Sequence, residues 1–299
     1  KSISIRLMHL NNFDSFFVPT AKGDIFCKKA GRGAPLLLLH GYPQTHLMWH
    51  FVAPELLDKF TVILADLRGY GQSMVPKSDS SHQAYSKKEM AKDMINVMDF
   101  FNFKTFFVAG HDRGGRVAHR LVRDFENRIK AICVLDICPT LDMYESTTME
   151  FAKSYFHWFF LIQPYDLPER MIMSDPKKWL DNCLNKWSGG QTFGLVEKEY
   201  LKAFQDPKRI HASCEDYRAS NTIDLQHDKE DRHKKLNIPL LLLWGKNGVV
   251  GNQFEPISIW QNYFSRKVKG IAIDSGHFIP EEKPQEVVKH FKTFFVKLI

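Results

Sequence analysis

The 299-residue sequence lacks the marks of exported, membrane-spanning and nucleic-acid-binding proteins. No apolar run approaches the ~18 residues of a membrane span, and the first residues contain no apolar signal core. The five cysteines are odd in number and form no C-x-x-C pair, which argues against a disulfide framework. The net charge is +7 without a long basic run. We therefore expect a reduced, cytoplasmic protein that binds neither membrane nor nucleic acid.

The composition is that of a globular enzyme, with 44% hydrophobic and 25% charged residues. The length suits one large domain or a domain with an inserted cap. Internal repeats and low-complexity segments are absent from the sequence. The excess of positive charge is interpreted mainly as a generally basic, solvated surface; alternatively, it could help to draw in a small anionic substrate.

Short apolar runs alternate with helical patterns along most of the chain. Two antiparallel strands are expected at 13–18 and 24–29, and buried strands follow at 35–39, 61–65, 106–109, 131–135, 238–244 and 268–273. Helices are expected near 49–57, 85–101, 116–125, 254–264 and 284–298. This alternation predicts an α/β fold whose mostly parallel, eight-stranded sheet has helices on both faces. Ligands bind such sheets at the carboxyl ends of the strands, where His40, Asp112 and Asp136 fall.

The strand pattern stops between residues 139 and 231. This stretch is rich in aromatic residues, proline and helical periodicity. We interpret it as a helical cap inserted after the strand that ends at Asp136. The core would then consist of residues 1–138 and 232–299.

Residues 108–116 are typical of a strand, a sharp turn and a helix. Gly110-x-Asp112-x-Gly114 has the spacing of a nucleophile elbow, with Asp where esterases carry Ser. Small residues suit this turn because strand and helix pass very close together. A carboxylate that attacks an acyl carbon gives an unfavourable anhydride, whereas attack on a saturated carbon gives a stable ester. Asp112 therefore predicts displacement at an sp3 carbon, with a halide or an epoxide oxygen as the leaving group.

A histidine and a second carboxylate would complete the catalytic group. His277 follows the last predicted strand, where a catalytic base is expected. Many such hydrolases place the acid after the penultimate strand, but residues 244–249 contain no carboxylate. Asp136 is the alternative, although it could merely cap the segment before Pro139. We expect Asp136 to orient His277 and to stabilise its charged form.

Two arginines accompany the nucleophile. Arg113 follows Asp112 directly, and Arg116 lies four residues on, hence on the same helix face. Their guanidinium groups could bind a substrate carboxylate through paired hydrogen bonds. They could instead only neutralise Asp112 or bind carboxylates of the cap. Because two cations would weaken the nucleophile, an anionic substrate explains them better. The backbone N–H groups of Tyr42 and Arg113 are expected to form the oxyanion hole.

Over essentially its whole length, the sequence resembles the fluoroacetate (haloacetate) dehalogenases of the α/β-hydrolase superfamily. The motifs that carry the resemblance are His-Gly-Tyr-Pro-Gln-Thr at 40–45, Asp-Leu-Arg-Gly-Tyr-Gly at 66–71, Gly-His-Asp-Arg-Gly-Gly-Arg at 110–116, His-Trp at 157–158 and Glu-Asp-Tyr-Arg-Ala at 215–219. The Arg after the nucleophile is more specific than the elbow, because epoxide hydrolases and haloalkane dehalogenases commonly carry Trp there.

The resemblance implies roles for the residues at the matching positions. Asp112, His277 and Asp136 match the catalytic triad, and Arg113 and Arg116 match the carboxylate clamp. It implies an α/β-hydrolase fold with a cap, no metal or organic cofactor, and a homodimer.

The resemblance also implies a halide pocket made of His157, Trp158 and Tyr217. An imidazole N–H, an indole N–H and a phenol O–H are all hydrogen-bond donors. Without the resemblance, His157 and Trp158 would be interpreted as cap packing. Trp187 matches a position near the substrate entrance.

The expected function is hydrolysis of a short 2-haloacid, fluoroacetate or chloroacetate, to glycolate through a covalent aspartyl ester. An enzyme restricted to chloro- and bromoacids would have the same motifs. An epoxide hydrolase would share the nucleophile and the base, with Tyr217 and either Tyr155 or Tyr144 as acids. A non-catalytic receptor on the same fold is a further alternative, against which the intact triad argues.

Overall fold

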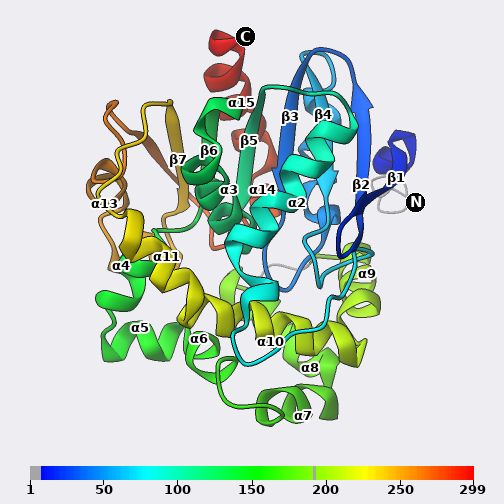
Figure 1. Cartoon of the computed structure of the whole chain (residues 1–299), viewed down its shortest axis with the longest axis vertical. Helices are drawn as coiled ribbons and strands as arrows, with labels where there is room; N and C mark the ends of the chain where they lie inside the picture. Colours follow the sequence, from blue (N-terminus) through cyan, green and yellow to red (C-terminus); the bar gives the residue numbers. More distant parts are fainter. Residues whose placement is uncertain (1–7, 191–192) are drawn as a thin grey trace.

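A computed structural model describes residues 8–190 and 193–299 and contains an eight-stranded sheet (Figure 1). Its strands lie in the order β1-β2-β4-β3-β5-β6-β7-β8. Their bounds are β1 (Asp14–Thr20), β2 (Gly23–Gly31), β3 (Ala34–Leu39), β4 (Phe60–Ala65), β5 (Phe106–His111), β6 (Ile129–Leu135), β7 (Leu240–Gly245) and β8 (Lys269–Ile273). β2 pairs antiparallel with β1 and β4, and the remaining pairs are parallel. The predicted α/β fold, with its mostly parallel sheet, is confirmed.

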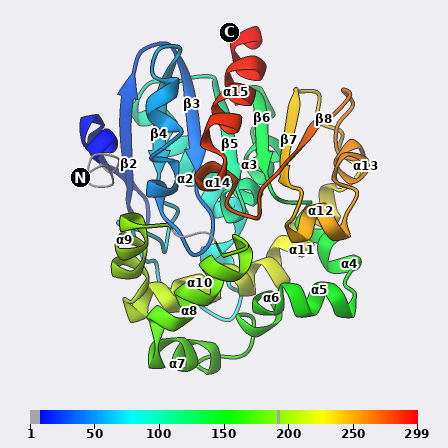
Figure 2. The same cartoon turned by 180° about the vertical axis from the view of Figure 1, so that it is seen from behind.

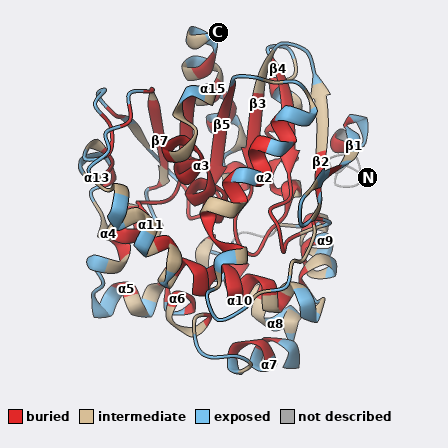
Figure 3. Cartoon of the chain, in the orientation of Figure 1, coloured by how far each residue is buried: buried red, intermediate tan, exposed pale blue. Residues whose placement is uncertain are grey.

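Helices cover both faces of the sheet. α2 (Lys87–Phe100) and α3 (Arg113–Asp124) lie on the face seen in Figure 1, and α15 (Pro284–Phe295) lies on the face seen in Figure 2. Between these layers, β4 and β5 are buried at every residue (Figure 3). Strands covered on both faces are expected to be continuously apolar, as these are.

α2 illustrates how sequence determines an element. The Ser86 side chain accepts the backbone N–H of Glu89, which satisfies one of the free donors at the start of the helix. Met90, Met94 and Met98 recur at helical spacing and are fully buried. The methionine stripe therefore belongs to the core.

Between β6 and β7 the chain forms helices that gather below the carboxyl ends of the parallel strands (Figures 1 and 2). They are α4 (Thr140–Glu145), α5 (Met149–Ser154), α6 (Phe156–Phe160), α7 (Leu167–Ser174), α8 (Pro176–Trp187), α9 (Leu195–Phe204), α10 (Pro207–Asn221) and α11 (Ile223–Asp231). We refer to this group as the cap helices.

Two predicted helices are shorter than expected. The segment 49–57 contains the 3-10 helix Ala53–Leu56 in place of an α-helix, because Pro54 lacks the N–H that a continuous α-helix needs there, and a separate 3-10 helix, His46–Trp49, precedes it. In the segment 254–264 the helix is α13 (Pro256–Gln261), which begins at Pro256 because a proline disfavours a helical residue before it; α12 (Val249–Gln253) precedes the segment and was not predicted.

The remaining helices are short. They are α14 (Ile279–Glu282), which the sequence did not predict, and the 3-10 helices Met8–Asn12, Gln83–Tyr85, Glu126–Arg128 and Val296–Leu298. Among the residues described, no helix is both long and apolar enough to cross a lipid bilayer. All five cysteines are buried free thiols.

Candidate active site

Asp112 occupies a tight turn between β5 and α3. Its φ of +49° lies in a region that non-glycine residues rarely adopt. A Cβ atom on Gly110 would lie 2.3 Å from the carbonyl oxygen of Gly114, and one on Gly114 would lie 2.4 Å from that of His40. Only glycine fits at either position. The structure thus contains the strand–turn–helix geometry that the G-x-D-x-G spacing predicts.

The carboxylate of Asp112 is buried and ionised. Its Oδ1 atom accepts the backbone N–H of Tyr42 over 2.8 Å. Burial raises the pKa of Asp112, but the charge of His277 and of the neighbouring basic side chains outweighs burial and brings this pKa to about 2. The backbone N–H of Arg113 belongs to the first residue of α3 and has no acceptor within the helix. It is therefore available to an oxygen held at Asp112.

His277 lies between the two predicted carboxylates. Its Nδ1 atom is 2.6 Å from Oδ2 of Asp136, and its Nε2 atom is 3.7 Å from Oδ2 of Asp112. Burial lowers the pKa of His277, but the hydrogen bond and charge of Asp136, together with the charge of Asp112, raise it above its ordinary value. The other oxygen of Asp136 accepts the backbone N–H of Gly245 over 2.9 Å. The geometry is that of a nucleophile, a base and an orienting acid.

Arg113 is fully buried and is paired with a cap carboxylate. Its Nε and Nη2 atoms lie 3.0 and 2.6 Å from the carboxylate oxygens of Asp216, on α10. Nη2 also donates to Ser220. Within the described part of the chain, Nη1 has no hydrogen-bond partner. Arg113 therefore binds a carboxylate of the cap helices, as one of the two alternatives predicted, and its Nη1 atom remains available as a donor.

Arg116 has a different environment. Its Nη1 atom donates to the carbonyl of Cys138 and the hydroxyl of Thr140, each at 3.0 Å, and Nη2 contacts the sulfur of Met143 at 3.4 Å. All three acceptors are uncharged. Its Nε atom is buried without a partner among the residues described.

The three predicted halide-binding residues come together beside the arginines. His157 and Trp158 are on α6 and Tyr217 is on α10, and all are buried. The guanidinium of Arg113 lies 4.0 Å from the ring centroid of Tyr217, and that of Arg116 lies 4.6 Å from the ring of Trp158. Burial holds the pKa of His157 well below its ordinary value, so its imidazole is neutral.

The polar atoms of this pocket are unpaired. Nδ1 of His157, Nε1 of Trp158 and the hydroxyl of Tyr217 are buried with no hydrogen-bond partner in residues 8–190 and 193–299. Buried polar groups normally have partners, so an unpaired cluster needs an explanation. A bound anion would satisfy all three.

Trp187 ends α8 and lines a route to the base. Its ring centroid is 4.4 Å from that of His157, and its carbonyl accepts the backbone N–H of His277 over 2.9 Å. A pocket of about 830 Å³, lined by Trp187, His277, Tyr155 and Gly248 among others, is open to solvent here. This position suits the predicted entrance.

The sequence reasoning missed two features of the site. The ring of Tyr42, considered only for its backbone N–H, packs 5.3 Å from the ring of Tyr217, and its hydroxyl accepts the indole N–H of Trp179 over 2.6 Å. Asp216 lies in the Glu-Asp-Tyr-Arg-Ala motif at 215–219, but the sequence did not suggest a role for it. Its position directly before Tyr217 was the only available signal.

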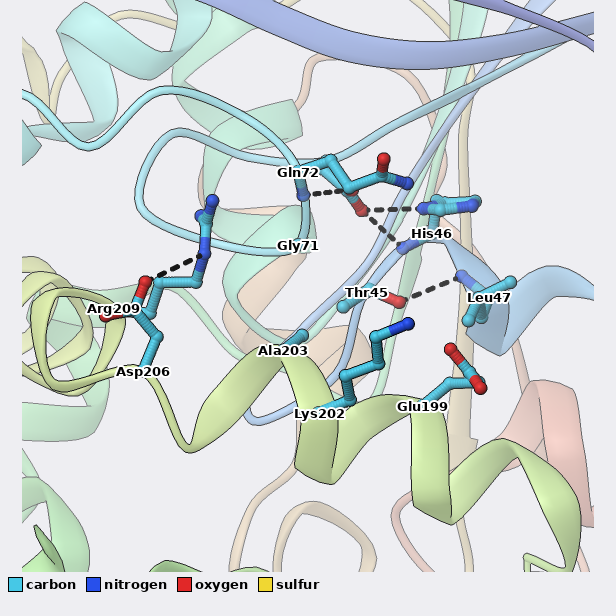
Figure 4. A pocket seen from close by; sticks show the side chains of 11 residues that line it. Thr45, His46, Leu47, Gly71, Gln72, Glu199, Lys202, Ala203, Asp206 and Arg209 are labelled. Atoms are coloured by element: carbon cyan, nitrogen blue, oxygen red, sulfur yellow. Dashed lines mark hydrogen bonds and ion pairs between the residues drawn. The ribbon is translucent and has the colours of Figure 1, made fainter.

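A second pocket, of about 340 Å³, lies between α9, the start of the 3-10 helix His46–Trp49 and the loop that carries Gln72 (Figure 4). Its lining mixes the cations Lys202 and Arg209 with acidic side chains. None of the predicted site residues lines it.

Comparison with known proteins places this geometry in a family. The alpha/beta hydrolase fold model matches residues 34–284. The chain is 37% identical to a fluoroacetate dehalogenase from Burkholderia sp over 94% of its own length and 93% of the relative's. It is 32% identical to a soluble epoxide hydrolase from Corynebacterium sp. (strain C12), over 90% and 92% of the two chains.

A crystal structure from Nostoc sp PCC 7120, provisionally assigned to the alpha/beta hydrolases, is also similar. It superimposes with a TM-score of 0.93 at 47% identity, covering 96% of this chain and 99% of that one. The resemblance to fluoroacetate dehalogenases is confirmed by the 37% identity over nearly the whole chain. The chain belongs to the alpha/beta hydrolase family.

Proposed function

We propose that the chain hydrolyses short 2-haloacids, with fluoroacetate or chloroacetate converted to glycolate and a halide ion. The observation that carries this proposal is the set of groups around Asp112: an ionised carboxylate, two arginines with unpaired N–H groups, and three unpaired donors. The similarity to a fluoroacetate dehalogenase supports it.

In the first step, Asp112 displaces the halide. Arg113 and Arg116 hold the substrate carboxylate through their free N–H groups. Oδ2 of Asp112, which faces His277, attacks the carbon that bears the halogen while Tyr42 holds Oδ1. The carbon–halogen bond breaks, and its electron pair leaves with the halide. The donors of His157, Trp158 and Tyr217 stabilise the departing anion, and an ester forms at Asp112.

In the second step, water cleaves the ester. Nε2 of His277 removes a proton as the water oxygen attacks Cγ of Asp112. The negative charge develops on Oδ1, which accepts the backbone N–H of Tyr42, and the free backbone N–H of Arg113 would be the second donor. Asp136 stabilises the imidazolium that forms. Glycolate leaves with the proton from His277, and the remaining proton on Asp112 is lost to solvent.

An ion-selective electrode tests the proposal directly. The enzyme is expected to release fluoride from fluoroacetate, or chloride from chloroacetate, in step with glycolate. Loss of this activity in Arg116→Ala, with the fold retained, would agree with a carboxylate clamp. No halide release from fluoro-, chloro- or bromoacetate would overturn the proposal.

Epoxide hydrolysis is the second candidate. One relative is a soluble epoxide hydrolase, and the hydroxyls of Tyr217 and Tyr144 are both buried and unpaired in the described residues. Such a pair could donate to an epoxide oxygen, with Tyr155 as an alternative to Tyr144. Hydrolysis of a neutral epoxide that survives Arg113→Ala and Arg116→Ala would favour this candidate.

Further proposals concern organisation and location. We propose a core of residues 1–138 and 232–299 and a cap of residues 139–231, which limited proteolysis followed by mass spectrometry would check. The homodimer stays a prediction, to be checked by analytical ultracentrifugation, as does a cytoplasmic location.

A further inference from the structure

The two arginines beside Asp112 differ in how their charge is balanced. Arg113 and Asp216 form an ion pair in which both side chains are fully buried. The pairing is bidentate, through Nε and Nη2, and Nη2 also donates to the Asp216 carbonyl over 3.1 Å. Three of the five guanidinium N–H groups are on these two nitrogens. The two N–H groups of Nη1 remain without a partner among the residues described. The direction of Nη1 is therefore set by Asp216.

Asp216 is itself held from two other sides. Lys87, at the start of α2, donates to one carboxylate oxygen of Asp216, and the hydroxyl of Tyr70 donates to the other over 2.7 Å. Lys87 also contacts Asp224 at 3.1 Å. Burial raises the pKa of Asp216, but the charges of Arg113 and Lys87 outweigh burial and hold it well below its ordinary value.

This buried cluster joins the nucleophile helix, α2 and the cap. It contains two cations, Arg113 and Lys87, and two anions, Asp216 and Asp224. The charges balance, so Arg113 adds little net positive charge to the substrate pocket.

Arg116 lacks such a balance. The acceptors of its hydrogen bonds are a carbonyl, a hydroxyl and a thioether, all uncharged. Among the residues described, no carboxylate forms an ion pair with Arg116, and the charge of Asp112, the nucleophile, favours its protonated form. That charge is consumed when the ester forms.

We propose that the arginines divide the recognition of the substrate. Asp216 is a positioning residue that fixes Arg113 as a charge-compensated, oriented donor, whereas Arg116 supplies the positive charge that selects an anionic substrate. This inference rests on the proposed function and names the determinant of its substrate class.

The role of Asp216 is tested by a double-mutant cycle with Arg113. Asp216→Asn is expected to raise KM for chloroacetate by about tenfold or more, with a smaller effect on kcat, because the donor loses its orientation. In an Arg113→Met background, Asp216→Asn should change KM no further, since Asp216 acts through Arg113. A wild-type KM in Asp216→Asn, or additive effects in the cycle, would overturn the inference.

Asp93 provides a matched control. It is buried, and it accepts Nε and Nη2 of Arg68 at 2.6 and 2.7 Å, the same bidentate geometry. Asp93→Asn should lower the melting temperature as Asp216→Asn does, and should leave KM unchanged. A rise in KM in both variants would show only a loss of stability and would overturn the positioning role.

The role of Arg116 is tested by binding, which does not need turnover. Ligand-detected NMR gives the dissociation constants of glycolate, an anion, and of glycolamide, its neutral counterpart. Arg116→Met should lose the preference for glycolate by about tenfold or more. The double variant Arg113→Met/Asp216→Asn, which removes one charge of each sign, should keep most of that preference. If the double variant lost the preference for glycolate and Arg116→Met kept it, the inference would be contradicted.

These outcomes separate the inference from the proposed function. If the wild type releases no halide from any haloacid, the proposed function fails, and the glycolate and glycolamide measurements still decide the division of charge. If the wild type is active but the cycle is additive, the inference fails alone. Should Asp216→Asn not fold, the charge-neutral double variant gives the decisive comparison.

Discussion

His277 and Asp136 share a hydrogen bond of 2.6 Å in the interior of the protein, although 141 residues separate them in the chain. Many hydrolases carry the acid in the loop after β7; here Gly245, the last residue of β7, instead donates its backbone N–H to Asp136. The carboxylate is therefore fixed on both oxygens. This arrangement agrees with the proposed triad, in which the acid follows β6.

Replacing Asp136 should separate the two chemical steps. In Asp136→Asn, His277 loses the charge that stabilises its imidazolium, so steady-state turnover is expected to fall by about 10³- to 10⁴-fold. Displacement of the halide by Asp112 involves no proton transfer to His277, so about one equivalent of halide should still appear rapidly. Quench-flow measurement of halide with chloroacetate checks both phases. Asp274→Asn, on the same loop as His277, is the control and should behave as the wild type.

The pH dependence should also distinguish the steps. The pKa of His277 is raised above its ordinary 6.5, and the base must be neutral to accept a proton. Steady-state turnover should therefore rise with pH through a value above 6.5. Because the pKa of Asp112 is about 2, the initial halide burst should be constant over the same range. If the halide burst and the steady-state turnover both decreased at acid pH with the same midpoint, these assignments would be contradicted.

Tyr217→Phe removes one donor from the predicted halide pocket. Losing a hydrogen bond to a charged group costs about 1.5–3 kcal/mol, which corresponds to roughly 10- to 100-fold in rate. The loss should be larger with fluoroacetate than with bromoacetate, because fluoride is the poorer leaving group. Comparison of kcat/KM for the two substrates tests this. Tyr263→Phe, whose hydroxyl bonds Asp142, should change neither rate.

Trp187 is expected to limit the size of the substrate. Its ring packs against His157, whereas its backbone carbonyl holds His277, so Trp187→Ala removes the ring and keeps the backbone contact. The ratio of 2-chloropropionate to chloroacetate turnover should increase by roughly tenfold. Lys186→Ala shortens a neighbouring side chain of the same pocket and should leave this ratio unchanged. An equal change of this ratio in both variants would show that the Trp187 ring does not limit the size of the substrate.

Much of the fold could be predicted from sequence because its signals are local. Continuous apolar runs located the buried strands, and the glycines around Asp112 located the turn. The bounds of the two shortened helices were harder to predict, because the effects of Pro54 and Pro256 compete with apolar spacing that favours one longer helix. α14 has four residues, too few for a periodic pattern.

The contacts between residues of the site were harder to predict from the sequence than the residues themselves. The spacing of Arg113 and Arg116 placed both beside Asp112, but it could not show that only Arg113 meets a cap carboxylate. Asp216 is 103 residues from Arg113, and their contact depends on how α10 docks against α3. Likewise, His157 and Trp158 are indistinguishable from cap packing until their unpaired nitrogens are seen.

A single turnover in heavy-oxygen water tests the covalent role of Asp112 most directly. With enzyme in excess over chloroacetate, water should attack Cγ of the ester, so the label is expected in the peptide that contains Asp112. Glycolate from that turnover should carry none. Label that enters glycolate directly, with none in Asp112, would contradict the account.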